Sequence, residues 1–368
     1  MKSVADLRRF AINRSLFPET TLADAITRMA FVQADPIRAP ARAQDLTLRP
    51  RVRGYRAGDL DANYGSLPIE EDFFINYGFV TTDLQRLMHP RTSVSPTGAN
   101  KRAKAILEFV RERGTVHQRE VDAHFAHGTV TNYWGGSSSA TTHLLEAMHY
   151  KGLVRVARRE NGIRIYATQQ HGAGPESAAE RRAHLDALVD AVVGLYAPVP
   201  TASLTYIISR LRYAAPHWRG EIKAAIVRAK KRFSHAVVDG HTWYWPEEAG
   251  ATVATGAAGA AGSDTVRVLA PFDPVVWDRR RFEMLWGWAY RFEAYTPAPK
   301  RKHGYYALPM LWRDRVIGWA NVTMSDGVVD ADLGYVTGRA PRDRGFKRAL
   351  EQELDAMQAF LSPRTPAR

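Results

Sequence analysis

Cysteine is absent from the 368 residues of the chain. Disulfide bonds, thiol catalysis and zinc sites built from cysteine are therefore excluded. Long apolar runs are absent as well, since no stretch approaches the roughly 20 residues that a membrane-spanning helix needs. The first six residues also lack the apolar core of a signal peptide. We therefore expect a cytoplasmic protein with no membrane partner.

Acidic residues are outnumbered, with 38 Asp and Glu against 51 Lys and Arg, so the net charge is +13. This excess favours an anionic partner. Nucleic acid suits it better than a membrane surface, because no basic amphipathic helix dominates the sequence. Most of the cations are arginine, which can form two parallel hydrogen bonds with a phosphate. A hydrophobic fraction of 45% indicates a globular chain.

Two stretches show the same order of elements, which is three helices followed by a β-hairpin. Residues 101–170 contain helical apolar stripes and then two alternating strands around Asn161-Gly162. Residues 178–247 repeat this order, and their hairpin turns at Asp239-Gly240. The pattern predicts tandem winged helices, a variant of the helix-turn-helix.

The rest of the chain predicts further modules. Residues 1–95 are interpreted as a degenerate winged helix, with one helix expected over residues 22–33. An Ala- and Gly-rich stretch at 249–263 predicts a flexible linker. Residues 265–338 are rich in strand patterns, including 291–296 and 305–311, and an amphipathic helix is expected at 342–362. The predicted fold class is α+β, with tandem winged-helix modules before a small C-terminal β-barrel or sheet and a closing helix.

A short polar motif, Gln33-Ala34-Asp35, is open to two interpretations. Asp35 before Pro36 is typical of a helix start, with Asp as the N-cap and Pro at the first helical position. Alternatively, the carboxylate could stabilise positive charge on a sugar or take a proton from water, and Gln33 could orient that water. Several arginines follow the motif, which suits chemistry on a nucleotide: Arg38, Arg42, Arg49, Arg51 and Arg53.

A second basic stretch lies far along the chain, where cations alternate with aromatic residues over 271–309. Such a mixture suits a phosphate backbone and unstacked bases. The polar face of the hairpin in 101–170 is basic too. The residues that we expect to contact DNA, besides the five arginines above, are Arg155, Arg164, Arg279, Arg280, Arg281, Lys300, Arg301, Lys302 and His303.

Two segments give the chain a resemblance to a known family. They are Gln33-Ala34-Asp35 with the following residues 42–48, and the long stretch 271–309. In both, the sequence resembles the winged-helix DNA glycosylases of the AlkZ and YcaQ type. The resemblance implies a C-shaped array of winged helices with a C-terminal β-barrel around a basic cleft. It also implies removal of alkylated or crosslinked bases, with Gln33 and Asp35 as the catalytic pair.

The sequence departs from this family after Arg42-Ala43 and in the acidic and aromatic segment 70–77, which lacks the histidine expected there. After Arg42-Ala43 the family usually has paired histidines, and this chain has Gln44 and Asp45. The departure indicates a divergent branch.

We expect a monofunctional DNA glycosylase that hydrolyses the bond to an N7-alkylated or crosslinked purine in damaged duplex DNA. No cofactor or metal is expected, and we expect a nucleoid-associated monomer. No lysine lies near the motif, so a Schiff-base lyase step is not expected. The alternative is a non-catalytic winged-helix DNA-binding protein, a regulator or an architectural factor. A peripheral membrane protein is a weaker interpretation.

Overall fold

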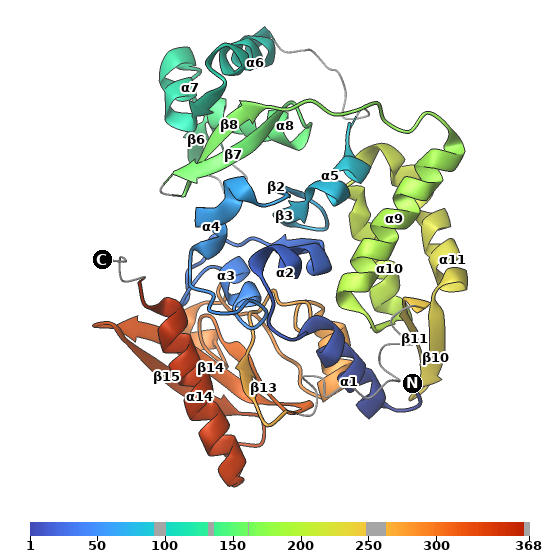
Figure 1. Cartoon of the computed structure of the whole chain (residues 1–368), viewed down its shortest axis with the longest axis vertical. Coiled ribbons are helices and arrows are strands. Elements are labelled where there is room, and N and C mark those ends of the chain that lie inside the picture. Colours follow the sequence, from blue (N-terminus) through green and yellow to red (C-terminus); the bar gives the residue numbers. More distant parts are fainter. Residues whose placement is uncertain (92–100, 132–135, 161, 248–262, 364–368) are drawn as a thin grey trace. The chain divides into compact units, whose positions relative to one another are not determined.

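The computed structural model describes residues 1–91, 101–131, 136–160, 162–247 and 263–363 (Figure 1). The predicted linker at 249–263, apart from Ser263, and Asn161 of the predicted turn lie outside the described residues. The contacts divide the chain into two compact units. The first contains residues 1–60, 190–208 and 226–368, and the second contains residues 61–189 and 209–225.

The N-terminal part of the first unit is mostly helical. Its elements are α1 (Val4–Ser15), α2 (Leu22–Met29), β1 (Phe31–Gln33) and α3 (Ala43–Leu48), and α4 (Asp59–Asn63) follows at the border of the two units. Ser3 and Asp6 form a capping box at the start of α1, in which each side chain accepts a hydrogen bond from the backbone N–H of the other residue. Leu7, Phe10 and Ala11 of α1 are fully buried, so this helix forms part of the core.

A four-stranded antiparallel sheet forms the C-terminal part of the first unit. Its strands, in spatial order, are β12 (Val266–Val268), β13 (Leu308–Trp312), β14 (Arg315–Ser325) and β15 (Val328–Tyr335). The helix α14 (Arg344–Leu361) lies along this sheet (Figure 1). Phe346 and Ala349 of α14 pack on Val266 and Met310, and this contact attaches the helix to the sheet. The sheet curls into a half-barrel. Of the two forms that the sequence predicts, a closed β-barrel or an open sheet, the structure has the open sheet.

The first unit also contains a hairpin and several short elements. These are β9 (Val199–Pro200), α10 (Thr201–Ser209), β10 (Ser234–Val238), β11 (His241–Trp245) and α13 (Arg279–Trp286). The turn between β10 and β11 is Asp239-Gly240, where both residues have positive φ, 48° and 72°. Two such residues are what a tight type I′ hairpin turn requires, so the predicted turn is confirmed here.

The second unit contains antiparallel strand pairs and a group of helices. Its elements are β2 (Ile69–Phe73), β3 (Tyr77–Thr81), α5 (Thr82–Met88), α6 (Lys101–Arg113), β4 (Thr115–His117), α7 (Gln118–Phe125), β5 (Thr129–Thr131), β6 (Ser137–Ser139), α8 (Ala140–Tyr150), β7 (Val154–Glu160) and β8 (Ile163–Thr168). Its core includes Ile106, Val121, Leu145, Val156 and Tyr166. The helices α9 (Ala178–Tyr196) and α11 (Ile222–Arg232) begin in the second unit and end in the first.

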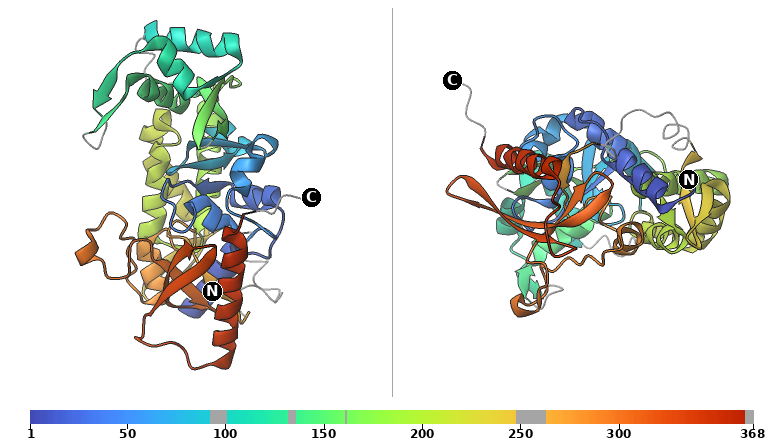
Figure 2. Two further views of the ribbon diagram at one scale, coloured as in Figure 1. Left: turned by 90° about the vertical axis from the view of Figure 1, so that its left-hand side faces the viewer. Right: turned by 90° about the horizontal axis from the view of Figure 1, so that it is seen from below.

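Two expected elements are wrong. The helix expected over residues 22–33 ends at Met29, because Ala30 takes a left-handed conformation and the chain then continues as β1. The strand expected over residues 291–296 is absent, and this part forms an irregular loop that stands away from the sheet (Figure 2). The hairpin of β7 and β8 is present as expected. The assignment of residues 101–170 and 178–247 as winged helices stays a prediction.

Candidate active site around Gln33 and Asp35

The loop that carries Asp35 follows a short buried strand. Phe31 and Val32 are each only 1% exposed, so burial of their side chains anchors β1. Gln33 is the last residue of β1, and Asp35 lies two residues later in an irregular loop. Both side chains are half-buried. The strand therefore supplies a rigid support from which the two polar side chains reach the border between core and solvent.

Asp35 does not cap a helix, because the next helix, α3, begins only at Ala43. Its Oδ1 accepts a hydrogen bond of 2.9 Å from the backbone N–H of Ile37, the pattern of an Asx turn. The helix-start interpretation of the motif is therefore wrong. Within the described residues the carboxylate accepts no second hydrogen bond and forms no ion pair with Lys or Arg.

The electrostatic surroundings of Asp35 follow from this lack of a cation. Burial raises the pKa of Asp35, and the Ile37 N–H only partly opposes that shift. The carboxylate in turn affects two tyrosines. Burial raises the pKa of both Tyr306 and Tyr295, and the negative charge of Asp35 raises them further. Both phenols therefore lie within electrostatic range of Asp35 and stay protonated at neutral pH.

Aromatic rings surround this part of the first unit. Tyr306 is 3% exposed, and its hydroxyl is a buried group with no hydrogen-bond partner among the described residues. The ring centroid of Phe292 lies 5.1 Å from the centroid of Tyr306, 5.2 Å from that of Phe272 and 6.1 Å from that of Tyr295. Tyr295 is 72% exposed. An exposed aromatic ring beside a buried hydroxyl and a carboxylate offers a surface on which a planar base can stack.

Tyr306 and Tyr295 were not among the residues expected at the site. The sequence shows Tyr305-Tyr306 as part of an aromatic and basic stretch, but it gives no sign that only one of the two is buried. The structure makes the distinction, because Tyr305 is 44% exposed and Tyr306 is buried.

Arg279 is half-buried against the ring of Tyr290. Its guanidinium carbon lies 4.5 Å from the ring centroid of Tyr290, and it donates a hydrogen bond to the carbonyl of Val276. The Tyr290 hydroxyl donates a bond of 2.7 Å to the carbonyl of Ala307. Burial lowers the pKa of Arg279. This arginine is half-buried, and its predicted contact with DNA stays a prediction.

Three of the arginines that we expected on DNA are instead part of the core. Arg51 and Arg281 have 0% exposure, and Arg49 has 8%. Arg51 forms two hydrogen bonds with Asp273, of 2.7 and 3.1 Å, whereas Arg281 donates to four backbone carbonyl groups. Arg49 pairs with Glu353 of α14. A DNA phosphate cannot reach Arg51 and Arg281, which are fully enclosed, and the Arg49 guanidinium is already held by Glu353, so we withdraw these three residues as DNA contacts.

Two further expected contacts belong to the second unit and have acidic partners there. Arg155 donates hydrogen bonds of 2.8 and 3.0 Å to the carboxylate of Glu70. Arg164 donates a bond of 3.3 Å to Glu146, and its guanidinium lies over the ring of Tyr77. Both are half-buried, and their role on DNA stays a prediction.

The remaining expected contacts are at least partly exposed. The loop with four of them is held by Glu293, whose Oε2 accepts 2.8 Å hydrogen bonds from the backbone N–H groups of Lys302 and His303. The guanidinium of Arg301 lies over the exposed ring of Tyr305. Exposed members of the set are Arg38, Arg53, Arg280, Lys300 and Lys302, and half-buried members are Arg42, Arg301 and His303.

The two residues that replace the expected histidines lie buried in α3. Asp45 accepts hydrogen bonds from the Tyr55 hydroxyl at 2.7 Å and from the Gly58 N–H at 3.1 Å, so it fixes the loop after α3. Gln44 is 4% exposed, and its Oε1 has no partner among the described residues. Among the described residues, the structure contains no group of three or more His, Asp or Glu side chains that could hold a metal ion.

Comparison with known proteins places this site in a family. The model of the family "DNA glycosylase AlkZ-like" matches residues 26–360, which include both the Asp35 loop and the aromatic segment. Among solved structures, the fold is similar to that of the Streptomyces sahachiroi DNA glycosylase AlkZ, with a TM-score of 0.63. The sequences are 14% identical, and the comparison covers 100% of each chain.

The class of protein is therefore a DNA glycosylase, a hydrolase of DNA repair that acts on a base in DNA. The chain belongs to the AlkZ-like DNA glycosylase family. None of the helices in the described ranges combines the length and apolarity that crossing a membrane demands.

Proposed function

We propose that this glycosylase hydrolyses the N-glycosidic bond of N7-alkylated purines in duplex DNA, including purines in crosslinks, and that Asp35 and Gln33 catalyse the step. The observation that carries the proposal is the state of Asp35. Among the described residues it is a half-buried carboxylate without a paired cation, and its charge acts on the tyrosines Tyr295 and Tyr306. Such a group is costly for stability and is therefore typical of a site of chemistry.

The chemistry follows from the charge of the lesion. An N7-alkylated purine carries a positive charge, so it leaves readily. As the C1′–N9 bond breaks, its electron pair passes to the purine and neutralises that charge. Positive charge then develops on the sugar, and the Asp35 carboxylate stabilises it. Water forms the new bond to C1′, and its proton passes to Asp35.

Gln33 supports this step by holding the water. An amide side chain donates and accepts hydrogen bonds at once, so it can fix both the position and the orientation of a water molecule. Gln33 ends the buried strand two residues before Asp35, so its backbone is held by the core. Its proposed part is therefore positioning rather than proton transfer.

Tyr306 is proposed as a further positioning residue. Its hydroxyl is buried, has no hydrogen-bond partner among the described residues, and stays protonated because burial and the charge of Asp35 raise its pKa. A protonated phenol can donate a hydrogen bond to the water or to the carboxylate when substrate is bound. This assignment explains why a polar group is retained at a position where an apolar ring would pack as well.

The reaction is proposed to stop at the abasic site. A lyase step needs an amine that forms a Schiff base with the sugar. The chain has no lysine between Lys2 and Lys101, so none is close in sequence to the motif. Exposed cations such as Arg38, Arg53 and Arg280 are proposed to hold the DNA backbone.

Duplexes with one N7-methylguanine or one N7-linked crosslink test the proposal. The protein is incubated with each, half of each sample is then heated in alkali, and the strands are separated by length. Alkali-dependent breaks at the lesion are expected with the wild type and should be about a hundredfold slower with Asp35→Asn. Breaks without alkali would contradict the monofunctional assignment. Equal rates for the two proteins would contradict the assignment of Asp35.

A further inference from the structure

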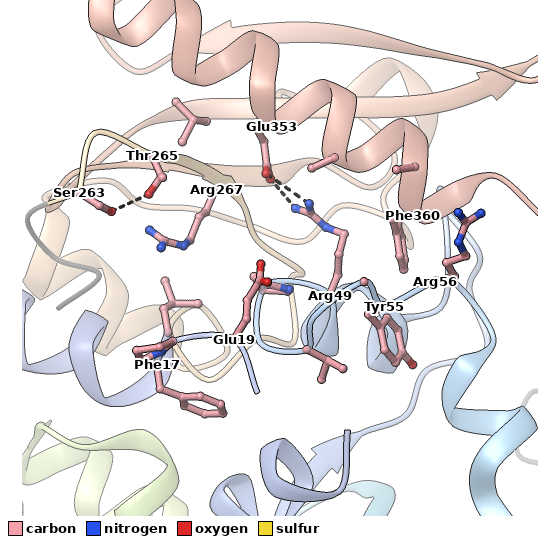
Figure 3. Close-up of a pocket in the computed structure, with 18 residues that line it drawn as sticks. Phe17, Glu19, Arg49, Tyr55, Arg56, Ser263, Thr265, Arg267, Glu353 and Phe360 are labelled. Carbon is pink, nitrogen blue, oxygen red and sulfur yellow. Dashed lines mark hydrogen bonds and ion pairs between the residues drawn. The ribbon is translucent and has the colours of Figure 1, made fainter. Parts of the chain in front are cut away.

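A second cavity in the first unit has features of a ligand site and is separate from the Asp35 loop (Figure 3). Its volume is about 530 Å³. Pockets for small molecules commonly measure about 300 to 1,000 Å³. It lies between residues 16–19, the loop 49–56, the start of β12 and the helix α14. Several apolar residues form its walls: Leu16, Phe17, Pro18, Pro50, Val52 and Phe360.

Arg267 is the unusual residue of this cavity. It lies between the buried Val266 and Val268 on β12, and its side chain projects into the cavity (Figure 3). Within the described residues its guanidinium forms no hydrogen bond and no ion pair. Burial lowers its pKa, and nearby carboxylates offset this only in part. A half-buried cation without a partner is costly, so its retention calls for a ligand or another compensation.

Other arginines of the first unit show what a satisfied guanidinium looks like there. Arg51 has an acidic partner and a backbone carbonyl for its hydrogen bonds. Arg49, also in the cavity wall, pairs with Glu353, although its Nε has no partner among the described residues. Glu353 is in turn engaged by the N–H of Val268. Glu353 is therefore already committed, and within the described residues Arg267 has no such partner.

Hydroxyl groups complete a set of donors near Arg267. Ser263 and Thr265 form a 2.6 Å hydrogen bond with each other, and Figure 3 shows both on the same side of the cavity as Arg267. The charged residues of the lining are three arginines and two glutamates, so the cavity is net positive. They are Arg49, Arg56 and Arg267 against Glu19 and Glu353. Glu19 is exposed at the surface, where water screens its charge.

We propose that this cavity binds a small phosphate monoester, with Arg267 as the main counter-charge and the Thr265 and Ser263 hydroxyls as further donors. A guanidinium with neighbouring hydroxyls matches the several oxygens of a phosphate group. The volume exceeds that of inorganic phosphate, and the apolar walls accommodate the organic part of the ligand. The site is independent of the proposed base excision, since none of these residues takes part in it.

Titration calorimetry with the full chain tests the proposal, with inorganic phosphate and adenosine monophosphate as probes and sodium chloride at equal ionic strength as the reference. Saturable binding of both probes is expected, with adenosine monophosphate tighter. Arg267→Met should weaken binding at least tenfold, about the loss of one hydrogen bond to a charged group. Arg348→Met is the matched control, because Arg348 is exposed on α14 outside the cavity. No saturation with the wild type, or equal binding by all three proteins, would overturn the proposal.

Two further measurements cover the other outcomes. If Arg267→Met does not fold, Thr265→Val removes one donor without removing charge, and severalfold weaker binding is expected. Crystals soaked in tungstate should show an anomalous peak beside Arg267, and a peak elsewhere would contradict the site. A phosphate of the DNA backbone is the other source of this chemistry. In that case Arg267→Met should lower the slope of log DNA affinity against log salt by about 0.9, the value for one phosphate contact, and phosphate and nucleotide should not bind. That result would show that the small-molecule proposal is wrong.

Discussion

The acidic strand β2 of the second unit and the Asp35 loop of the first unit hold carboxylates in opposite circumstances. In the second unit, three consecutive acidic residues of β2 are almost fully buried: Glu70, Glu71 and Asp72, with exposures of 6%, 1% and 1%. Each forms an ion pair with an arginine, and the partners are Arg155, Arg159 and Arg91, in that order. In the first unit, Asp35 is half-buried and forms no ion pair within the described residues.

The pKa values show what this difference means. Burial alone would raise the pKa of Asp72, but Arg91 and His89 hold it well below its usual range. Asp35 has no such cation among the residues that the structure describes, and burial raises its pKa. The pKa values of Glu71 and Asp72 are lowered, so these two carboxylates contribute to stability, and their paired charge makes them unsuited to catalysis. Burial raises the pKa of Glu70 despite its pair with Arg155. The unpaired carboxylate is free to respond to positive charge on a substrate.

The largest expected effect concerns Asp72→Asn. The change leaves Arg91, which is 2% exposed, without its anionic partner, so we expect a loss of about 3 to 5 kcal/mol in the free energy of unfolding. Denaturant unfolding at pH 7 measures it. Because the pKa of Asp72 is lowered on folding, its contribution is present above the unfolded value of about 4 and is lost as the pH falls below it. The gap between variant and wild type should therefore close in acid.

The double variant Asp72→Asn with Arg91→Met is the control for this prediction. It removes both charges, so part of the stability should return relative to Asp72→Asn alone. A single variant as stable as the wild type would show that the buried acidic segment is not a set of stabilising ion pairs.

Asp35→Asn should have the reverse signature, with a large loss of activity and almost no loss of stability. We expect single-turnover excision to fall about a hundredfold or more, the scale for removing one group that stabilises the transition state. The pKa of Asp35 is raised on folding, so the charged carboxylate costs stability at neutral pH and the variant should be equally or slightly more stable. Gln33→Ala should show a similar or smaller loss of rate. Wild-type rates from a folded Asp35→Asn protein would remove Asp35 from the mechanism.

The pH dependence of excision should show the same carboxylate. Asp35 acts as an anion, so the rate should fall about tenfold for each pH unit below its pKa. Because burial raises this pKa, the midpoint should lie above the usual value for Asp of about 3.9. Single-turnover rates at saturating protein, with DNA binding measured at each pH, separate this effect from weakened binding. A rate that stays constant down to pH 4 would contradict the prediction.

Tyr306→Phe should lower the excision rate by about tenfold, the effect of one hydrogen bond of 1 to 1.5 kcal/mol. Stability should not fall, since the hydroxyl has no hydrogen-bond partner among the described residues of the free protein. Affinity for undamaged DNA should be unchanged. Tyr305→Phe is the matched control, because Tyr305 is the exposed neighbour. Equal loss in both variants would mean that the effect is not specific to Tyr306.

Local patterns in the sequence predicted much of this fold. The turn Asp239-Gly240 was predictable because two residues with positive φ leave few alternatives to a tight hairpin. The closing helix, α14, was predictable because its apolar residues recur at helical spacing. The helix α2 ended early, since Phe31 and Val32 join a buried strand that the helical pattern of residues 22–33 concealed.

The electrostatic roles were not predictable, because they depend on partners far away in the chain. Arg51 and Asp273 are 222 residues apart, and Arg49 and Glu353 are 304 residues apart, so no local pattern shows that these arginines are core residues. The motif at Asp35 was visible in the sequence. The sequence did not show that Asp35 forms no ion pair with a cation among the described residues. Of three consecutive arginines, the helix α13 makes Arg279 half-buried, Arg280 exposed and Arg281 fully buried.

The smallest expected effect separates two of these neighbours. Arg280→Gln removes one exposed cation, so the slope of log affinity against log salt should fall by about 0.9 for one lost phosphate contact, with a few-fold weaker binding near physiological salt. Excision at saturating protein should be unchanged. Arg281→Gln should instead destabilise the fold, because it leaves backbone carbonyl groups in the core without their donor. Binding of duplex DNA measured from about 50 to 200 mM salt, with thermal unfolding of both variants, tests the pair. An unchanged slope for Arg280→Gln would remove this residue from the DNA interface and leave the loop at Lys300–Lys302 as the next candidate.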